Sequence, residues 1–406
     1  MKFDFNAFLE KFKYDPNSVK KNYDGKTDVY LAKVSYRYAY IKRILTLVLL
    51  FVIIVFLLSG NLTYNKLFYL VKDIKLASDF VNSVHDTITY NSGNSQSFVT
   101  YRSGIAVASR ERFSIFSAGG RELYFSNHSY GNPALAASDK HVLLYDVGGK
   151  QFSLYNSFSK VREETLNYGI YSASIANGGT FALVTKSDKY DSVVFLYHKN
   201  GTKYDYNFAS GLVSGVELSD DGSQMAVLLT FAEGDGIRTE IRLYKAGSES
   251  YEKANVTFEG VPFGIKILKS GNILVVGSKG VNAFSSKLNL LGEYLPDEEI
   301  YLYSFGDDNI AVSHLSDSGS KTQAVLLNNR GKKDKTITFD ERLLDIALCD
   351  GYLFTQKLGS FERINITSGA TKAFDIIATD FRMRVSDKNT LIICNDSYAK
   401  FLNFGR

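Results

Sequence analysis

The chain has 406 residues, with 47 Lys and Arg against 43 Asp and Glu, and 45% of its residues are hydrophobic. This near balance of charge excludes a protein held to nucleic acid by a strongly basic surface, and the apolar fraction excludes a disordered chain. The two cysteines, Cys349 and Cys394, exclude a fold built on disulfide cross-links. Both are expected as small buried residues of strands, and one disulfide between neighbouring repeats stays open.

Residues 1–40 are predicted to form a cytoplasmic basic tail. Four apolar residues recur near its start at helical spacing: Phe5, Phe8, Leu9 and Phe12. This spacing predicts a short amphipathic helix that ends before Pro16. Such a helix could lie on the inner membrane surface or bind a cytoplasmic partner, and a marginal helix in a flexible tail is the alternative.

An uncharged apolar run follows the tail. It consists of Ile44, Leu45, Leu47, Val48, Leu49, Leu50, Phe51, Val52, Ile53, Ile54, Val55, Phe56, Leu57 and Leu58, with Thr46 as its single hydroxyl. With its uncharged neighbours the run is long enough to cross a bilayer as one helix, so residues 41–62 are predicted as a transmembrane signal-anchor. The region before the run is too long for a cleaved signal peptide, and no clear small-residue cleavage pattern follows.

Basic residues gather on the N-terminal side of the run. They are Lys33, Arg37, Lys42 and Arg43, whereas the other flank has no Lys or Arg until Lys66. The positive-inside bias therefore predicts a cytoplasmic N-terminus and an extracytoplasmic C-terminal part. The expected localisation is the cell membrane, crossed once, with residues 63–84 as a stalk.

Residues 85–406 are predicted as one repetitive extracytoplasmic β-domain. A turn signal of Gly, Asn, Asp or Ser precedes a short apolar strand eight times, first at Ser103-Gly104 and last at Asp387–Asn389. The repeat is about forty residues long, which is typical of a four-stranded propeller blade. Asn, Asp and Gly tolerate the positive φ of tight hairpins. Inner strands are nearly all apolar and outer strands half polar, as expected for blades that pack face to face.

The two ends of the repeat array predict how the ring closes. The last unit stops after its third strand, Lys400–Phe404, and the isolated segment Thr87–Tyr90 precedes the first complete unit. That segment is predicted to supply the missing outer strand, which would remove two exposed edges. The fold class is therefore all-β, a β-propeller with eight blades favoured and seven as the alternative. The longest repeat contains Glu233–Gly236, interpreted as a longer exposed hairpin loop.

No catalytic, cofactor-binding or metal-binding residues are predicted. The five histidines are scattered, and turn chemistry explains the acidic pairs Asp220-Asp221 and Asp307-Asp308. The charged residues singled out on the predicted inner strands are Lys266, Lys269, Arg382 and Arg384. They would indicate a site only if they met at one mouth of the propeller channel.

The basic tail, the span at 44–58 and the imperfect propeller together resemble a family of uncharacterised single-pass membrane proteins of clostridial bacteria. That family is a domain of unknown function with an extracytoplasmic β-propeller-like part. The resemblance covers most of the chain and implies no known reaction and no functional residue. A distant similarity to the propeller lipoproteins of outer-membrane assembly concerns the fold only.

These features predict a membrane-tethered, non-catalytic propeller that serves as a binding platform, without a cofactor or nucleic acid. The expected partner is an envelope or extracellular protein or a glycan. The alternative is a cell-envelope hydrolase of glycans or peptides with its site at the channel mouth, which would need several carboxylates and an Arg to converge there.

Overall fold

The computed structural model describes residues 29–58, 87–90, 97–234, 236–316, 319, 321–376 and 380–405. The chain divides into two compact units, Met1–Lys75 and Leu76–Arg406. The amphipathic helix predicted near Phe5 and the stalk predicted at 63–84 lie outside the described residues.

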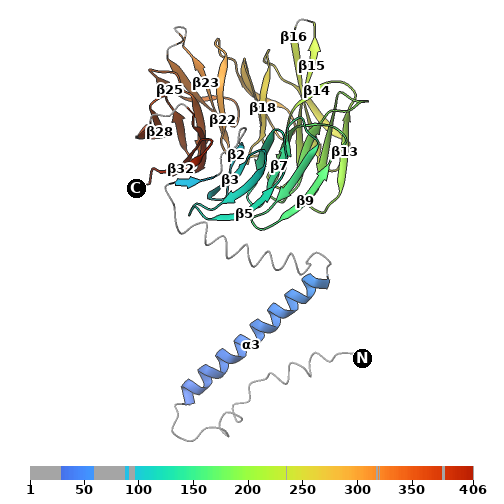
Figure 1. Cartoon of the computed structure of the whole chain (residues 1–406), viewed down its shortest axis with the longest axis vertical. Coiled ribbons are helices and arrows are strands. Elements are labelled where there is room, and N and C mark those ends of the chain that lie inside the picture. The colour runs from blue at the N-terminus through green and yellow to red at the C-terminus, as the bar shows by residue number, and fades with distance from the viewer. Residues whose placement is uncertain are drawn as a thin grey trace. The chain divides into compact units, whose positions relative to one another are not determined.

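The described residues of the first unit form one helix, α3, Val29–Leu58 (Figure 1). The helix contains the whole apolar run Ile44–Leu58 and begins well before it. Most of the apolar side chains described between Ile41 and Ile54 are exposed, with Leu49 at 61% and Phe51 at 67%. Within the described part of the chain, no helix has the length and hydropathy needed to cross a membrane.

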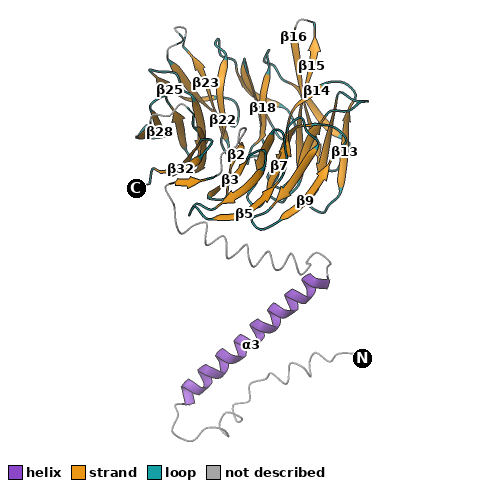
Figure 2. Cartoon of the chain, viewed as in Figure 1, coloured by secondary structure: helices purple, strands orange, loops and turns teal. Residues whose placement is uncertain are grey.

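The second unit is an eight-bladed β-propeller, since its strands form eight antiparallel sheets of four (Figures 1 and 2). We name the strands of each blade A to D from the axis outward. Blade 1 is β2 (Ser97–Tyr101), β3 (Gly104–Ala108), β4 (Arg112–Phe116) and β5 (Glu122–Asn127). Blade 2 is β6 (Pro133–Ala137), β7 (Val142–Asp146), β8 (Gln151–Tyr155) and β9 (Lys160–Thr165). Blade 3 is β10 (Ile170–Ile175), β11 (Phe181–Thr185), β12 (Ser192–Tyr197) and β13 (Lys203–Phe208). Blade 4 is β14 (Leu212–Leu218), β15 (Gln224–Glu233), β16 (Gly236–Lys245) and β17 (Tyr251–Asn255).

The second half of the ring repeats this arrangement. Blade 5 is β18 (Pro262–Ile267), β19 (Ile273–Gly277), β20 (Gly280–Phe284) and β21 (Leu290–Tyr294). Blade 6 is β22 (Ile300–Phe305), β23 (Asn309–Leu315), β24 (Thr322–Asn328) and β25 (Lys333–Phe339). Blade 7 is β26 (Asp345–Cys349), β27 (Tyr352–Gln356), β28 (Ser360–Asn365) and β29 (Thr371–Asp375). Blade 8 is β30 (Arg382–Asp387), β31 (Thr390–Cys394) and β32 (Tyr398–Asn403), and β1 (Thr87–Thr89) completes it.

The hydrophobic core lies between neighbouring blades, which explains the gradient of polarity along each repeat. Strands such as β3 and β19 are buried along their whole length, because both of their faces are covered by adjacent sheets. Outer strands such as β9 alternate between exposed and partly buried residues. The strands predicted after each Gly, Asn or Asp turn are the B strands of the eight blades.

The ring closes as the sequence predicted. Strand β1 pairs antiparallel with β32, with Ile88 opposite Ala399. Ile88 is only 3% exposed and packs in one cluster with Phe98 of blade 1 and Phe401 of blade 8. The eighth blade is therefore built from both ends of the propeller sequence, and the choice between seven and eight blades is settled at eight.

Blade 4 has the expected longer hairpin, with its turn at Glu233–Gly236, and its strands extend up to that turn. Strands β15 and β16 have ten residues each, and their pairing continues to Glu233 opposite Gly236. The guanidinium of Arg238 lies 4.2 Å from the ring centroid of Phe231 and 3.1 Å from the carboxylate of Glu233. These cross-strand contacts extend the ladder into the hairpin that projects at the top of Figure 1.

The alternating strand directions give the propeller two different faces. The lower face carries the A–B and C–D turns, and the upper face carries the B–C turns and the D–A connections. Thr87 pairs with Lys400, whereas the N–H of Tyr90 donates to the carbonyl of Ser397 in the B–C turn of blade 8. Strand β1 therefore runs from the lower face to the upper face.

Candidate functional site

The acidic pairs of the lower face take part in turn chemistry and link neighbouring turns. Asp221 Oδ1 accepts hydrogen bonds from Ser219 Oγ at 2.7 Å and from the N–H of Ser223 at 2.9 Å. Asp308 Oδ1 accepts from the N–H of Ser270 in the preceding blade at 2.9 Å. These contacts agree with the interpretation of the carboxylates as turn residues.

A pocket of about 230 Å³ lies between the A–B turns of blades 6 and 7, lined by residues that include Asp307, Asp308, Cys349 and Asp350. Burial, aided by nearby carboxylates, raises the pKa of the Cys349 thiol to about 11, so this thiol is protonated at neutral pH. Among the residues that the structure describes, no three His, Cys, Asp or Glu side chains are grouped to hold a metal ion. The pocket thus offers neither an activated nucleophile nor a cation site.

A partly buried ion pair joins the inner strands of blades 4 and 5; the Lys266 side chain is 37% exposed and that of Glu217 is 16% exposed. Lys266 Nζ donates to Glu217 Oε1 at 2.6 Å, and Ser174 Oγ of blade 3 donates to the other carboxylate oxygen at 3.1 Å. Burial raises the pKa of Glu217, and the ammonium group opposes that effect. Burial acts to lower the pKa of Lys266, but the charge and hydrogen bond of Glu217 outweigh it, so that pKa is raised. This group holds three blades together.

The charged residues singled out from the sequence do not meet at one mouth of the channel. Lys266 pairs with Glu217, and Lys269 Nζ donates to Asp307 Oδ2 of the next blade at 2.7 Å. Arg384 Nε donates to the backbone carbonyl of Phe98, across the junction of blades 8 and 1, at 3.0 Å. These three side chains connect adjacent blades, and Arg382 lies exposed on β30.

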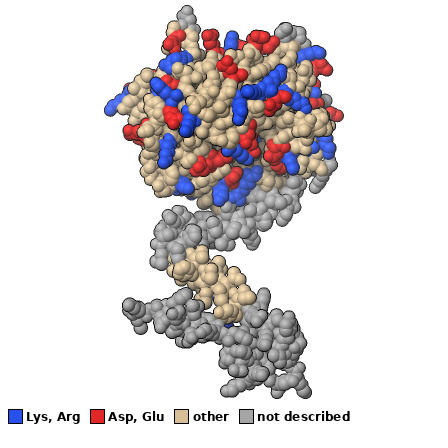
Figure 3. All heavy atoms as spheres, turned by 180° about the vertical axis from the view of Figure 1, so that it is seen from behind, with Lys and Arg blue, Asp and Glu red and all other residues tan. Residues whose placement is uncertain are grey.

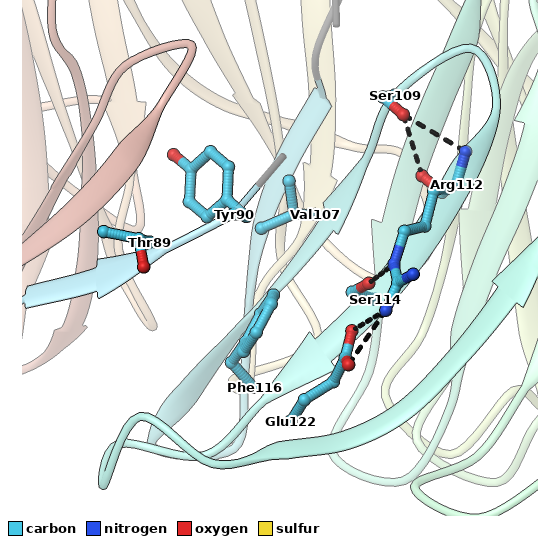
Figure 4. Close-up of a pocket in the computed structure, with 8 residues that line it drawn as sticks. All are labelled: Thr89, Tyr90, Val107, Ser109, Arg112, Ser114, Phe116 and Glu122. Carbon is cyan, nitrogen blue, oxygen red and sulfur yellow. Dashed lines mark hydrogen bonds and ion pairs between the residues drawn. The ribbon is translucent and has the colours of Figure 1, made fainter. Parts of the chain in front are cut away.

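A second pocket, of about 220 Å³, lies at the junction of the closing strand and blade 1 (Figure 4). Arg112 Nη2 donates to both oxygens of Glu122, at 2.8 and 2.9 Å, and its Nε donates to Ser114 at 3.1 Å. Thr89 and Tyr90 form part of the wall. The guanidinium of Arg112 and the carboxylate of Glu122 neutralise each other. We therefore interpret this ion pair as a contact that stabilises the rim of the propeller. Sequence reasoning missed this pair, because Arg112 is opposite Asn127 and Glu122 is opposite Phe116 in the β4–β5 ladder, so the contact depends on how the long Arg112 side chain lies across the sheet.

The exposed large apolar side chains of the propeller are distributed unequally between its faces. One group belongs to the B–C turns, the D–A connections and the inner strands: Tyr171, Tyr190, Leu212, Ile237, Val261, Phe263, Leu295, Tyr303, Leu344 and Leu358. A second group lies on outer D strands: Phe125, Val161, Tyr251 and Leu290. Among the described residues, none lies in an A–B or C–D turn of the lower face. Val161, Tyr251 and Leu290 stand at the first or second residue of their D strands, next to C–D turns. The upper face therefore carries most, but not all, of the exposed apolar side chains.

A repeated irregularity of the inner strands contributes to this asymmetry. In blades 3, 4, 5 and 6 the pairing of strands A and B shifts at the second residue of strand A or close to it. Blades 1, 2 and 7 keep a regular register there. A bulge turns a side chain away from its normal direction, and the bulged residues Tyr171 and Phe263 are 44% and 39% exposed. The ring of Phe263 stacks on Tyr303 at 6.1 Å.

Five of the exposed apolar residues, from blades 4 and 5 and the connection to blade 6, form what we call the upper patch: Leu212, Ile237, Val261, Phe263 and Leu295. Backbone hydrogen bonds join the segments that carry them, from Val256 N to Thr239 O and from Ser278 N to Val261 O. Leu295 packs beside Gly280, the first residue of β20 in the same blade. Sequence reasoning missed this patch because its members come from different loops and strand ends.

The surface charges give no continuous basic area on the side of the propeller visible in Figure 3, where Lys and Arg are interspersed with Asp and Glu. The imidazole of His314, near the end of β23, is buried, with its Nε2 3.2 Å from the hydroxyl of Tyr294. Both cysteines are free thiols in the structure.

The sheet arrangement places the chain in the class of eight-bladed β-propellers. The chain belongs to DUF5711, a family of unknown function, whose profile matches residues 81–403. No curated protein matches the sequence.

Solved structures with a similar fold come from distant proteins. The chain is similar to Saccharomyces cerevisiae Sqt1, with a TM-score of 0.56, 9% identity and coverage of 80% of this chain and 100% of that one. It is similar to BamB from Moraxella catarrhalis, with a TM-score of 0.55, 14% identity and coverage of 80% and 99%. The chain is also similar to Chaetomium thermophilum Sqt1 bound to the N-terminus of ribosomal protein L10. The TM-score is 0.55, the sequence identity is 10%, and the match covers 78% of this chain and 99% of that one. At these identities the likeness concerns the fold alone.

Proposed function

We propose that this protein is a membrane-tethered, non-catalytic platform whose propeller binds a protein partner through its upper face. The observation that carries the proposal is the concentration of exposed apolar side chains on the upper face. Exposed apolar area on one face of a soluble domain is typical of an interaction surface.

The inner strands support binding rather than catalysis. Glu217, Lys266 and Arg384 are engaged in contacts between blades, which leaves them unable to act as a convergent acid and base. A likeness of fold adds a modest argument, because one of the similar propellers, Sqt1, was solved with the N-terminus of a ribosomal protein bound.

The tether rests on the sequence. The uncharged run from Ile44 to Leu62 approaches the length that a bilayer requires, and the structure describes it only as far as Leu58. Exposed apolar side chains around α3, such as Leu49 and Phe51, need a covering that lipid would provide. We place the propeller outside the cell membrane, because Lys33, Arg37, Lys42 and Arg43 precede the run.

Photo-crosslinking in intact host cells tests the binding face. A crosslinking amino acid at Val261 on the upper face should give discrete protein adducts. The same amino acid at Lys332, in a C–D turn of the lower face, is the matched control. Adducts from position 332 but none from 261 would assign the function to the other face.

Labelling with a membrane-impermeant maleimide tests the topology separately. A Lys332→Cys variant should be labelled in intact cells, whereas Lys11→Cys in the tail should be labelled only after lysis. The reverse pattern would show that the propeller is cytoplasmic, and the proposed tether orientation would then be wrong.

A further inference from the structure

We infer that the partner of the upper face is a cationic peptide segment in which basic and apolar residues alternate, bound in extended form across the upper patch. This inference rests on the proposed function and adds the chemistry of the partner. It is argued from the acidic border of the patch and from the free strand edge beside it.

The apolar part of the surface is large enough for several side chains of a peptide. Leu212, Val261 and Leu295 are each more than half exposed, and Phe263 presents part of its ring beside them. The connecting segments are fixed by backbone hydrogen bonds, including Ile300 N to Ser278 O at 2.8 Å. A rigid apolar surface loses little conformational freedom on binding, which favours affinity.

Acidic residues border the patch on the projecting hairpin and on the D–A connections of blades 4 and 5: Glu233, Glu259, Asp297, Glu298 and Glu299. The bases nearby are Arg238 and Lys279, and both already pair with acids. Arg238 lies 3.1 Å from Glu233, and Lys279 lies 3.9 Å from Glu299. The border therefore keeps an excess of negative charge.

This charge decides which partner fits. Anionic lipid headgroups and nucleic acid would be repelled by the acidic border, whereas Lys or Arg side chains flanking apolar ones would be attracted to it. Electrostatic complementarity of this kind selects partners and speeds their association more than it adds affinity.

The projecting hairpin offers backbone groups to an extended peptide. The pairing of β14 with β15 ends at Leu212 opposite Thr230, while β15 itself continues to Glu233. Within the described residues, Phe231–Glu233 thus lacks a strand neighbour on the side of β14, directly beyond Leu212. An extended segment can add to such an edge through main-chain hydrogen bonds, with its apolar side chains toward the patch.

Fluorescence anisotropy with model peptides tests the inference on the full chain in nanodiscs of zwitterionic lipid. The probe is a labelled peptide of alternating Lys and Leu, and empty nanodiscs correct for partition into lipid. Two comparison peptides carry Glu in place of Lys, or Ser in place of Leu. The Lys/Leu peptide should bind most tightly, and its affinity should fall as salt rises.

Two variants and their controls locate the peptide. The variant E259Q/D297N/E299Q should weaken binding of the Lys/Leu peptide about tenfold, because each border charge contributes a few-fold. The matched control E249Q/E252Q/D375N, which removes exposed acids elsewhere, should leave binding within about twofold. The variant V261S/L295S should also weaken binding, whereas V161S/L290S, at outer strands of similar exposure, should not.

The outcomes separate the two proposals. If the Glu/Leu peptide binds as well as the Lys/Leu peptide, or if neutralising the border acids has no effect, the charge inference is overturned and the binding face stands. If no peptide binds, the inference also fails, and crosslinking at Val261 then decides on the platform. If V261S/L295S binds like its control, the peptide lies elsewhere, and the proposed use of the upper face is overturned with the inference.

Discussion

Arg384 and Phe98 are 286 residues apart in sequence, yet the Nε of Arg384 donates a hydrogen bond of 3.0 Å to the backbone carbonyl of Phe98. Nη1 of the same guanidinium donates to the carbonyl of Met383 at 2.7 Å. The side chain therefore joins the inner strand of the last blade to that of the first. It acts near the axis, while β1 closes the ring at the rim.

Replacing Arg384 with Gln should destabilise the propeller by about 1–3 kcal/mol, because a partly buried carbonyl loses a charged donor. The measurement is the free energy of unfolding in guanidinium chloride. Arg110→Gln, at an exposed position in the B–C turn of blade 1, is the control and should change stability by less than about 0.5 kcal/mol. Equal values for the two variants would show that the contact does not hold the ring closed.

The closing strand gives a second test of the ring. Ile88→Ala should cost about 2–4 kcal/mol, because Ile88 is 3% exposed and packs against both terminal blades. Thr89→Ala, at an exposed position of the same strand, leaves the backbone pairing intact and should be nearly neutral. Thermal unfolding of both variants provides the comparison. A neutral Ile88→Ala would mean that blade 8 is stable without β1.

The sequence was sufficient to predict the repeat, the eight blades and the closing strand, because these depend on local signals. A Gly, Asn or Asp turn before an apolar strand can be recognised without its partners. Thr87–Tyr90 was recognisable as the closing strand because the last repeat lacks one strand. The longer exposed hairpin of blade 4 was predicted from the repeat length, but the length of its ladder was not, since the ladder depends on cross-strand contacts such as Phe231 with Arg238.

The upper patch and the ion pair could not be predicted in the same way. Lys266 was noticed as a charged residue of an inner strand, but its partner Glu217 lies 49 residues earlier in the neighbouring blade. The bulges that expose Tyr171 and Phe263 leave the hydrophobic alternation almost unchanged. These features depend on how one sheet packs against the next, which the turn pattern does not specify.

The partly buried pair predicts an asymmetric response to mutation. Lys266→Met should destabilise the protein by about 1–3 kcal/mol at pH 7, because it leaves the mostly buried carboxylate of Glu217 without its charge partner, and the exposure of the Lys266 side chain screens part of the effect. The double variant Glu217→Gln/Lys266→Met should recover much of this loss, since no buried charge remains. Denaturant unfolding of the two variants and the wild type gives the comparison. A double variant as unstable as Lys266→Met would place the cost in packing rather than in charge.

The pH dependence of the Lys266→Met variant follows from the raised pKa of Glu217. A carboxyl group whose pKa is higher in the folded than in the unfolded state favours folding when protonated. Its contribution is fully present below the unfolded pKa of about 4.3 and is lost as pH rises through the folded pKa. The stability deficit of Lys266→Met relative to Glu217→Gln/Lys266→Met should therefore shrink as pH falls from 7 to about 4. A deficit independent of pH would contradict this account.

The two thiols provide a test that requires no mutation. Burial raises the pKa of Cys394 to about 12, and burial with nearby carboxylates raises that of Cys349 to about 11. At pH 8 a thiol of pKa 11 is ionised to about one part in a thousand, and only the thiolate attacks a disulfide reagent. The folded protein should therefore react slowly with 5,5′-dithiobis(2-nitrobenzoate), with Cys349 reacting about tenfold faster for each unit of pH up to its pKa. In guanidinium chloride both thiols should react at once, which also shows that they are unpaired. Rapid release of one equivalent of 2-nitro-5-thiobenzoate from the folded protein at pH 8 would contradict this account. It would mean that the Cys349 thiol is more accessible and more acidic than its burial near Asp307 and Asp350 implies.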